Sequence, residues 1–477
     1  MIKPRKPSPT ESPLLFEIDP EPLKETLTAW GGVPLVVQAF RSLGVPASVQ
    51  RQVHLKERDR GYDEATMVES LVVLNGLGGE CVEDLQHLRD DEGLKEMLGH
   101  EIPSPEAARK FLNQFHSEEK IEEAKQQRQP EQIAFIPAEG DALAGLGEVN
   151  RELVQELAKR CPEQRIVTVD MDATIIESRK REALRTYEGE RGYQPMLAVW
   201  AEMDVVLADE FRDGNVPAMM APLPVAQRAF SVVPQTGMSY SFRGDSACHE
   251  SALIQWLRDE KRAEGPQGCI GFAISARMSG ALHQAILQIP EGSWQPYGEP
   301  HAREIRECAE VEFVPGEKSE HKDTQPLRYV AIRIRHRQEE LFADGSKVKH
   351  FAVVSNIWDW KPGRLIQWHR EKAGTVEGVH DVVKNELAGG VMPSKYFGAN
   401  AAWLRLAVIT HNVLTALKRL ALPAELLRAR PKRLRFLIFN TAGRLVQHAR
   451  KLVLRLATLG ARILTWKEAM QALPVAT

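Results

Sequence analysis

The spacing of apolar residues changes along this chain from a helical pattern to an alternating one. From Leu23 to about Ser117 the apolar residues recur at three- and four-residue spacing, as in A-T-M-V-E-S-L-V-V-L-N-G-L. That spacing is typical of amphipathic helices, so it predicts an all-helical domain over residues 23–117. Residues 118–164 are predicted to be a charged connector followed by a helix, and residues 1–22, rich in proline and polar side chains, to be disordered.

From residue 165 onward the pattern predicts strands. The stretch R-I-V-T-V-D-M-D-A-T alternates, and further strand candidates are M-L-A-V-W, V-V-L-A-D-E-F, S-Y-S-F-R-G and C-I-G-F-A-I-S-A. Residues 281–355 hold strand candidates among loops rich in proline, glycine and charge, which predicts a β-rich insertion. Helices return in residues 356–425, and residues 426–477 form a basic segment. The chain therefore has an α/β pattern, with a sheet domain over 165–280 and 356–425 that the insertion interrupts.

Composition excludes few classes of protein, but it indicates the cellular compartment in which the protein is expected. The 477 residues are 43% hydrophobic and 27% charged, which is ordinary for a globular chain of several domains. The five cysteines are scattered and form no Cys-x-x-Cys pair, so they are expected to be reduced and intracellular. Neither a signal-peptide pattern nor an unbroken apolar segment of membrane-spanning length occurs. We therefore expect a cytoplasmic protein that has no membrane partner.

The stretch V-T-V-D-M-D-A-T, residues 167–174, carries the first sign of chemistry. In a strand Thr168, Asp170 and Asp172 point to one face, because successive side chains alternate. Two carboxylates that close repel each other unless a cation or a shared proton compensates. A divalent metal ion suits such a pair, since Mg²⁺ takes carboxylate oxygens and keeps positions for water and phosphate.

One family with this type of motif is the haloacid-dehalogenase-type phosphatases, which open with Asp-x-Asp-x-Thr after an apolar strand. The later R-G-D-S-A-C-H-E resembles their second acidic motif, but His249 stands where its second acid belongs. Their chemistry also needs a lysine between the two motifs, and none occurs from Arg181 to Glu260. A phosphatase of this type is kept only as a remote alternative.

The RNase H-like strand-transfer fold places its acids differently. It carries one aspartate on the first strand, a second at the end of a later strand and a glutamate on a helix near the end of the domain. Asp172, two residues before Thr174, fits the first position, and Asp245, after S-Y-S-F-R-G, fits the second. In E-K-A-G-T-V-E-G-V-H-D-V-V-K-N-E-L the valines form an apolar stripe, and Glu377 and Lys384 fall about 20° apart on a helical wheel, away from that stripe.

Six motifs together carry a resemblance to a known family. They are V-D-M-D-A-T, R-G-Y-Q-P-M-L, E-F-R-D-G-N, F-R-G-D-S, E-K-A-G-T-V-E-G-V-H-D-V-V-K-N-E-L and F-G-A-N-A-A-W. In this order they resemble a bacterial DDE transposase, most similar to insertion sequence family 1380, over about residues 20 to 470. The resemblance implies an RNase H-like catalytic core in which Asp172, Asp245 and Glu377 are the catalytic, metal-binding acids. The spacing to Thr174 favours Asp172 over Asp170 as the first ligand, with Asp170 as a possible additional acid.

The resemblance also implies the reaction. A transposase of this class binds the terminal inverted repeats of its element, cleaves DNA at the element ends and joins the 3′-OH ends to target DNA. The three carboxylates would hold two Mg²⁺ ions, for which Mn²⁺ can substitute. Partners would be double-stranded DNA and a second copy of the chain, at the nucleoid in the cytoplasm. A catalytically inactive, DNA-binding descendant of a transposase and a metal-dependent nuclease are the alternatives.

Basic and amide side chains in several segments are expected to contact DNA. Before Glu377 the chain departs from the related signature Tyr-x-x-Arg-x-x-x-Glu, with Arg370 at the tyrosine position and Ala373 at the arginine position. Arg370 or Lys372 is expected to supply the charge of the missing arginine. Arg212 and Asn215, which follow Glu210 and Phe211, could contact DNA or cap a turn. Ser104 is predicted to be the N-cap of a helix that carries Arg109 and Lys110, either a recognition helix or a plain capped helix. Ten Arg or Lys residues and no acid lie between residues 428 and 462, and their cations share a face whether K-L-V-L-R-L is a strand or a helix. The expected DNA-binding residues are Lys384, Arg370, Lys372, Arg212, Asn215, Arg109, Lys110, Arg444, Lys451 and Arg455.

Overall fold

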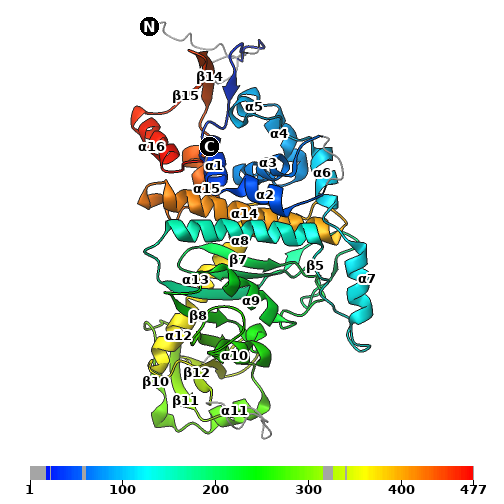
Figure 1. The fold of residues 1–477 in the computed structure, drawn as a ribbon. Helices are drawn as coiled ribbons and strands as arrows, with labels where there is room; N and C mark the ends of the chain where they lie inside the picture. The colour runs from blue at the N-terminus through cyan, green and yellow to red at the C-terminus, as the bar shows by residue number, and fades with distance from the viewer. Residues whose placement is uncertain (1–17, 22, 56–60, 315–325, 339–340, 476–477) are drawn as a thin grey trace, which may run out of the picture.

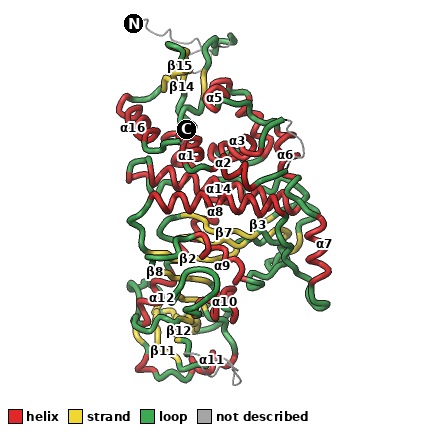
Figure 2. Tube along the Cα trace, viewed as in Figure 1, coloured by secondary structure: helices red, strands yellow, loops and turns green. Residues whose placement is uncertain are grey.

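The structure, a computed structural model, describes residues 18–21, 23–55, 61–314, 326–338 and 341–475. Most of the segment predicted to be disordered, residues 1–17 and 22, lies outside the described residues. The molecule is elongated, with helices and a small sheet at one end, a central sheet beneath two long helices, and an extension of that sheet at the other end (Figures 1 and 2).

A nine-stranded mixed sheet forms the centre of the molecule, in the order β10-β11-β12-β13-β9-β8-β2-β6-β7. Strands β6 and β7 are antiparallel to their neighbours, whereas β8 and β9 run parallel to β2. Three antiparallel strands followed by two parallel ones are consistent with the RNase H-like core that the sequence predicts. The core strands are β2 (Ile166–Ala173), β6 (Met196–Trp200), β7 (Val205–Glu210), β8 (Ser239–Gly244) and β9 (Gly271–Ser275).

The predicted insertion forms strands, but they do not make a sheet of their own. Strand β13 pairs antiparallel with β9, so the insertion extends the central sheet at its edge. Helix α12 (Pro362–Arg370) covers one face of this extension with Leu365 and Ile366, which pack with Val330 and Val353. The elements of the insertion are α11 (Gly280–Leu287), β10 (Gln295–Pro296), β11 (Glu304–Val311), β12 (Arg328–His336) and β13 (Val348–Ser355).

The helical prediction for residues 23–117 is confirmed, since α-helices dominate the segment. These helices are α1 (Val33–Ser42), α2 (Val45–Gln52), α3 (Glu64–Leu77), α4 (Leu85–Arg89), α5 (Glu92–Leu98) and α6 (Pro105–Asn113), with the 3-10 turn η1 (Val82–Asp84) before α4. The connector contains α7 (Glu118–Gln127) and α8 (Asp141–Arg160), the sheet domain adds α9 (Pro222–Val232) and α10 (Ser251–Arg258), and α13 (Lys372–Asn385) and α14 (Phe397–Leu420) follow the insertion.

Helix α14 joins the two halves of the molecule. It is buried along most of its length and packs against α1, α3 and α6 on one side and against α8 and β7 on the other. The N-terminal helices therefore share one continuous hydrophobic core with the sheet domain. None of the helices that the structure describes combines the length and apolar character that a membrane crossing requires.

The basic C-terminal segment packs back onto the N-terminal helices. After α15 (Pro431–Leu434) and a π turn (Arg435–Phe439), strands β14 (Gly443–His448) and β15 (Lys451–Leu456) form a hairpin, and α16 (Gly460–Gln471) follows. Strand β14 also pairs with β1 (Leu27–Thr28), and α16 contacts α1. The stretch K-L-V-L-R-L is therefore a strand, which decides between the two possibilities that the sequence leaves open.

A buried charge network ties α14 to the sheet. Arg405 on α14 donates hydrogen bonds to Asp209 at 3.0 Å, to Glu139 at 2.7 Å and to the Leu143 carbonyl at 2.6 Å. The two carboxylates raise the pKa of Arg405 well above its usual value, although burial alone would lower it. This arginine thus holds together α14, the end of β7 and the connector before α8.

We predict that Arg405→Ala lowers the free energy of unfolding by about 3–5 kcal/mol, because Asp209 would be left charged, buried and unpaired. Urea denaturation followed by circular dichroism measures this loss. Arg151→Ala is the matched control, since its ion pair with Glu148 is partly exposed and is expected to contribute less than about 1 kcal/mol. Equal losses in the two variants would contradict the role given to Arg405.

Candidate active site

Asp172 and Asp245 come together because β2 and β8 are parallel neighbours. In their register Met171 pairs with Gly244. Asp172 follows Met171 and Asp245 follows Gly244, so the two aspartates lie side by side. Both line a cavity of about 600 Å³, together with Asn215. Burial, and then the negative charge of Asp172, raise the pKa of the Asp245 carboxyl. The cavity therefore concentrates negative charge at the carboxyl ends of two adjacent strands.

A lysine partly compensates this charge. Lys372, the first residue of α13, places its Nζ 2.6 Å from Oδ2 of Asp172, and its side chain is 9% exposed. Burial acts to lower the pKa of Lys372, but the charge and the hydrogen bond of Asp172 raise it overall. The sequence predicts that Lys372 contacts DNA, yet its ammonium group is engaged by a candidate metal ligand. Sequence reasoning did not foresee this contact, since 200 residues separate the two partners.

Asp170 lies on the same side of β2 but has a different environment. Its side chain is fully buried, with Arg243 Nε 2.6 Å from Oδ1 and Nη2 2.8 Å from Oδ2. The Thr375 hydroxyl on α13 also donates to Asp170. Asp170 is absent from the lining of the cavity. Its contacts are those of a structural ion pair, which does not support a role as an additional catalytic acid.

The third predicted acid, Glu377, is not gathered with the other two. It lies on an exposed side of α13 and does not line the cavity. Among the described residues, no group of three or more His, Cys, Asp or Glu side chains is close enough to hold a metal ion. Helix α13 nevertheless runs along β2, with Thr375 bonded to Asp170 and Lys384 Nζ donating to the Ile175 carbonyl at 2.5 Å. Glu377 stays a prediction, on the helix next to the cavity.

Two residues expected to bind DNA after β7 have different positions. Arg212 is fully buried, pairs with Glu210 at 2.6 Å and donates to the Ala218 carbonyl at 3.4 Å. The guanidinium of Arg212 holds the following loop and has no exposed surface, which favours the turn-capping alternative over a contact with DNA. Asn215, three residues later, lines the cavity.

Helix α6 supports the plain capped helix rather than a recognition helix. Ser104 accepts a hydrogen bond from the Ala107 amide at 3.2 Å, which confirms the predicted N-cap. Arg109 forms an ion pair with Glu83, and Lys110 pairs with Glu106 at 2.7 Å. The helix itself packs against α14 and η1. Both cations therefore already have acidic partners within the protein.

The C-terminal basic run divides into two parts. In the first part the cations bind the protein itself, as Arg430 pairs with Glu386 at 2.5 Å and Arg435 donates to the Gly76 carbonyl at 2.9 Å. Arg370, near α13, similarly lies over the Tyr297 ring, 5.1 Å from its centroid. These arginines stabilise contacts between distant segments.

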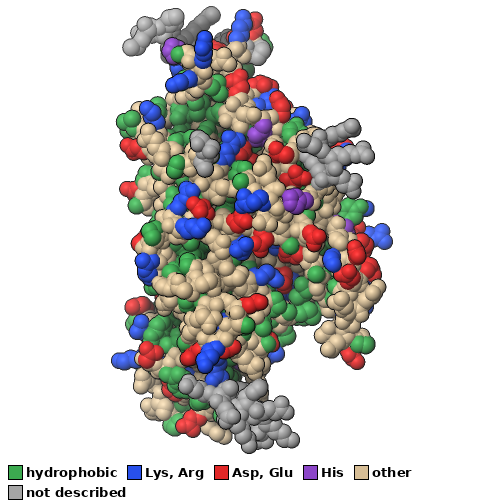
Figure 3. Space-filling view, viewed as in Figure 1, with side chains coloured by type: hydrophobic (Ala, Val, Ile, Leu, Met, Phe, Trp, Pro, Cys, Tyr) green, Lys and Arg blue, Asp and Glu red, His purple; other side chains and the backbone are tan. Residues whose placement is uncertain are grey.

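The second part forms a cationic face on the β14–β15 hairpin. Arg444 is directly opposite Arg455, and His448 is opposite Lys451, so all four side chains share one face. Ala449 and Arg450 form the two-residue turn, both with positive φ, and place Arg450 at the tip. Lys and Arg side chains gather at this end of the molecule (Figure 3).

Few acids compensate this face. Arg444 lies 3.8 Å from Glu25, whereas Lys451, Arg455 and Arg450 make no ion pair with any residue that the structure describes. Like charges directly opposite on a hairpin are destabilising. A polyanion would relieve that repulsion.

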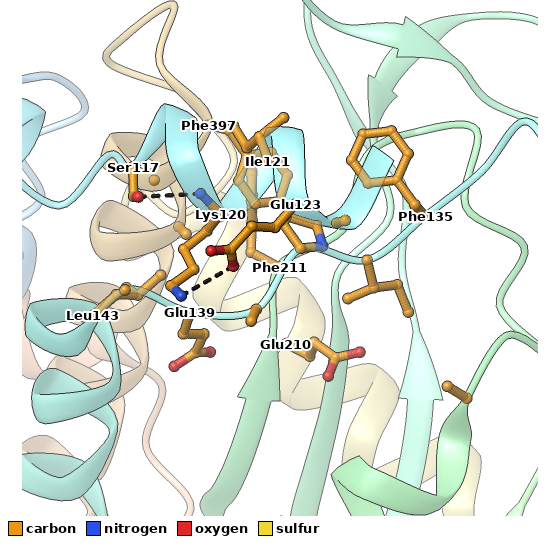
Figure 4. A pocket seen from close by; sticks show the side chains of 18 of the residues that line it. Ser117, Lys120, Ile121, Glu123, Phe135, Glu139, Leu143, Glu210, Phe211 and Phe397 are labelled. Atoms are coloured by element: carbon orange, nitrogen blue, oxygen red, sulfur yellow. Dashed lines mark hydrogen bonds and ion pairs between the residues drawn. The ribbon is translucent and has the colours of Figure 1, made fainter. Parts of the chain in front are cut away.

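A second large cavity, of about 490 Å³, lies between α7 and the sheet domain (Figure 4). Phe211 and Phe397 line it, and Lys120 pairs with Glu123 at 3.0 Å along α7. Its acid Glu139 is held by Arg405. Because its charged groups are paired and it contains none of the three predicted acids, this cavity is not the candidate active site.

Comparisons with known proteins concern the chain as a whole and not its individual residues. A family model described as transposase DDE domain group 1 matches residues 24–474. Among solved structures, the chain is similar to a piggyBac transposase synaptic complex with hairpin DNA, determined by cryo-EM, at 9% sequence identity and a TM-score of 0.39. That match covers 82% of this chain and 77% of the other, but so weak a likeness assigns no role to any residue. Comparison with curated proteins gives no match.

We predict that Asp170→Asn lowers the free energy of unfolding by about 3 kcal/mol or more, because it leaves the Arg243 guanidinium buried without its charge partner. Asp172→Asn is the matched control. It should cost clearly less, because the side chains of Asp172 and Lys372 are 17% and 9% exposed, whereas those of Asp170 and Arg243 are 0% and 3% exposed. Urea denaturation of both variants measures the difference, and a larger loss for Asp172→Asn would show that the roles of the two acids are reversed.

Proposed function

The chain belongs to the DDE transposase family, and from this premise we propose that it cuts DNA at the ends of an insertion sequence and joins those ends to target DNA. In this proposal it recognises the terminal inverted repeats and transfers their 3′-OH ends by phosphoryl transfer. The observation that carries the proposal is the pair Asp172 and Asp245, which line one cavity at the ends of adjacent parallel strands. The assignment to insertion sequence family 1380 rests on the six sequence motifs.

The strand order supports an RNase H-like catalytic core. The first strand of such a core carries the first acid and the parallel strand beside it carries the second, and β2 and β8 stand in this relation. The glutamate is expected on a helix late in the domain, where α13 carries Glu377. The proposed acids thus belong to three separate elements, with Glu377 on a helix that contacts β2 but outside the cavity lined by the other two.

The residues of the cavity fit a divalent metal ion. Asp172 and Asp245 offer hard oxygen donors, and their mutual repulsion favours a bound cation. The Lys372 ammonium group already occupies one cationic position beside Asp172. Asp172 and Asp245, with Glu377, would hold the Mg²⁺ ions, for which Mn²⁺ can substitute. Bound metal would supply activation of the attacking water or 3′-hydroxyl and stabilise the leaving 3′-oxygen.

The other residues of the site position these acids. Arg243 on β8 binds Asp170 on β2, and it also donates to the Trp368 carbonyl at 2.6 Å and to Glu371 at 3.1 Å. One guanidinium therefore fixes both acid-bearing strands relative to the start of α13. Lys384, anchored at the end of β2, is proposed to contact a DNA phosphate beside the cut.

DNA binding is proposed to use the cationic face of the β14–β15 hairpin. Its side chains are exposed, close together and poorly compensated, as a phosphate-tracking surface requires. Cutting two element ends in one reaction further suggests a dimer, which we propose for the synaptic complex. Such a protein would act at the nucleoid, in the cytoplasm.

We predict that Asp172→Asn, Asp245→Asn and Glu377→Gln each reduce metal-dependent cleavage of terminal-repeat DNA by at least about 10³-fold, because each removes a ligand of the catalytic metal. Purified protein, DNA carrying the repeats that flank the gene, and Mg²⁺ test this on a sequencing gel. Chelation with EDTA should abolish cleavage by the unaltered protein, while binding in a gel-shift assay persists in all three variants.

Glu163→Gln serves as the control, since this exposed acid precedes β2 but does not line the cavity. Normal cleavage by the Asp245 variant would overturn the assignment of the site. Cleavage without any joining to target DNA would indicate a nuclease instead. Binding without any cleavage by the unaltered protein would indicate an inactive descendant of a transposase.

We predict that the double variant Lys451→Gln, Arg455→Gln weakens DNA binding and reduces the magnitude of the negative slope of log affinity against log salt concentration by roughly 2, since each phosphate contact contributes about −0.9 to that slope. Fluorescence anisotropy over a range of NaCl concentrations measures the slope. Lys110→Gln, whose side chain is paired with Glu106, should leave the slope unchanged. An unchanged slope in the double variant would exclude the hairpin as a phosphate-binding surface.

A further inference from the structure

Three parallel strands, rather than two, end at the candidate active site. Strand β9 runs parallel to β8, which runs parallel to β2, and the three are adjacent in the sheet. The first two are followed by Asp172 and Asp245. Beyond the end of β9 comes Arg277, which lines the same cavity. Ligands of α/β sheets bind at the carboxyl ends of parallel strands, so this arginine stands at a position suited to a substrate contact.

The backbone at Arg277 is held in place while its side chain is not. The Arg277 amide donates to Nδ1 of His249 at 2.9 Å, and the preceding Ala276 amide donates to the Ala352 carbonyl at 2.8 Å. Among the residues that the structure describes, Nη2 of Arg277 has only the sulfur of Met219, at 3.6 Å, as an acceptor. A thioether is a weak acceptor for a group with five N–H donors. The structure thus fixes where the guanidinium is attached and leaves most of its donors available.

A second exposed guanidinium, that of Arg185, also lines the cavity. Arg185 belongs to β4 (Leu184–Arg185), in a small sheet with β3 (Ile176–Glu177) and β5 (Arg191–Tyr193). Its Nη1 donates to the Gly189 carbonyl at 2.9 Å. Within the described part of the chain, neither Arg185 nor Arg277 pairs with an acid. Both lie beside two carboxylates, yet Asp172 is engaged by Lys372 and Asp245 accepts from the Ala247 amide at 3.0 Å.

The cavity also limits what can enter. Its volume of about 600 Å³ is that of a small-ligand site, so it can hold a short piece of one nucleic-acid strand. Tyr187, which is 76% exposed, forms part of the wall next to Arg185. Burial, the neighbouring Glu188 and the charges of Asp245 and Asp172 raise the pKa of the Tyr187 phenol, which places this ring within electrostatic reach of both acids.

We propose that Arg277 binds a phosphate next to the scissile phosphate on the strand that is cut, and that Arg185, which lines the cavity from β4, binds the same strand. This inference rests on the proposed function, which supplies DNA as the substrate. A guanidinium binds two phosphate oxygens at once, so Arg277 fixes the direction of the strand across the cavity. Neither arginine is among the residues that the sequence motifs single out.

The test combines Arg277→Gln with DNA in which one phosphate at a time is replaced by a neutral methylphosphonate around the cleavage site. Arg277→Gln is expected to slow cleavage at saturating DNA by about 10- to 100-fold, the range for a lost hydrogen bond to a charged group. At one position the methylphosphonate should slow the unaltered protein by a similar factor and add little to the defect of Arg277→Gln. Arg277→Lys should recover part of the rate, because it keeps the charge but not the paired donors.

Arg303→Gln is the matched control, since this exposed arginine lies in the insertion and outside the cavity. It should cleave at the normal rate. Cleavage at the normal rate by Arg277→Gln, or methylphosphonate effects that add fully to the variant at every position, would overturn the inference. The non-additivity between one phosphate and one side chain is a result that a merely structural role of Arg277 would not produce.

A binding measurement without metal separates this inference from the proposed function. Anisotropy with terminal-repeat DNA ending in a single-stranded overhang should show the same phosphate-specific loss for Arg277→Gln. If the unaltered protein shows that pattern but never cleaves DNA, the inference stands and the proposed function fails. If it cleaves DNA and the pattern is absent from both binding and cleavage, the proposed function stands and the inference fails.

Discussion

The buried ion pair between Asp170 and Arg243 is the contact on which the candidate active site depends. It joins β2 to β8 directly across their parallel register, and the same guanidinium reaches the end of α12 and the residue before α13. Charges buried to this degree are stable only when each has its partner. The pair therefore holds the strands that carry Asp172 and Asp245, and the helix that carries Glu377, in one arrangement.

The charged side chains at the candidate active site are only partly paired with one another. Asp172 and Asp245 raise the local negative potential, Lys372 neutralises only part of it, and two arginines face the cavity without acidic partners. A protein selected for stability alone would pair these groups with one another. Their presence in one cavity is better explained by a substrate that brings its own negative charge together with a divalent cation.

Arginine and lysine side chains have different roles in the interior and on the surface of the protein. Arg405, Arg212 and Arg435 are drawn into the protein, where they bind carboxylates or backbone carbonyls. Lys451 and Arg455 share the face of an exposed hairpin with few acids nearby. Sequence spacing cannot distinguish these two groups of cations, because both occur in short basic stretches next to apolar residues.

The sequence by itself determined the helical N-terminal region, the strands of the sheet and the two acids at strand ends, because helical and strand periodicities are local properties. It also favoured Asp172 over Asp170, in agreement with their different surroundings, although the ligand role itself stays a prediction. Only the tertiary structure decided that Lys372 pairs with Asp172, that Arg212 is buried, that the insertion extends the central sheet and that Arg277 shares the cavity. Each of these depends on contacts between segments distant in sequence, which no local pattern encodes.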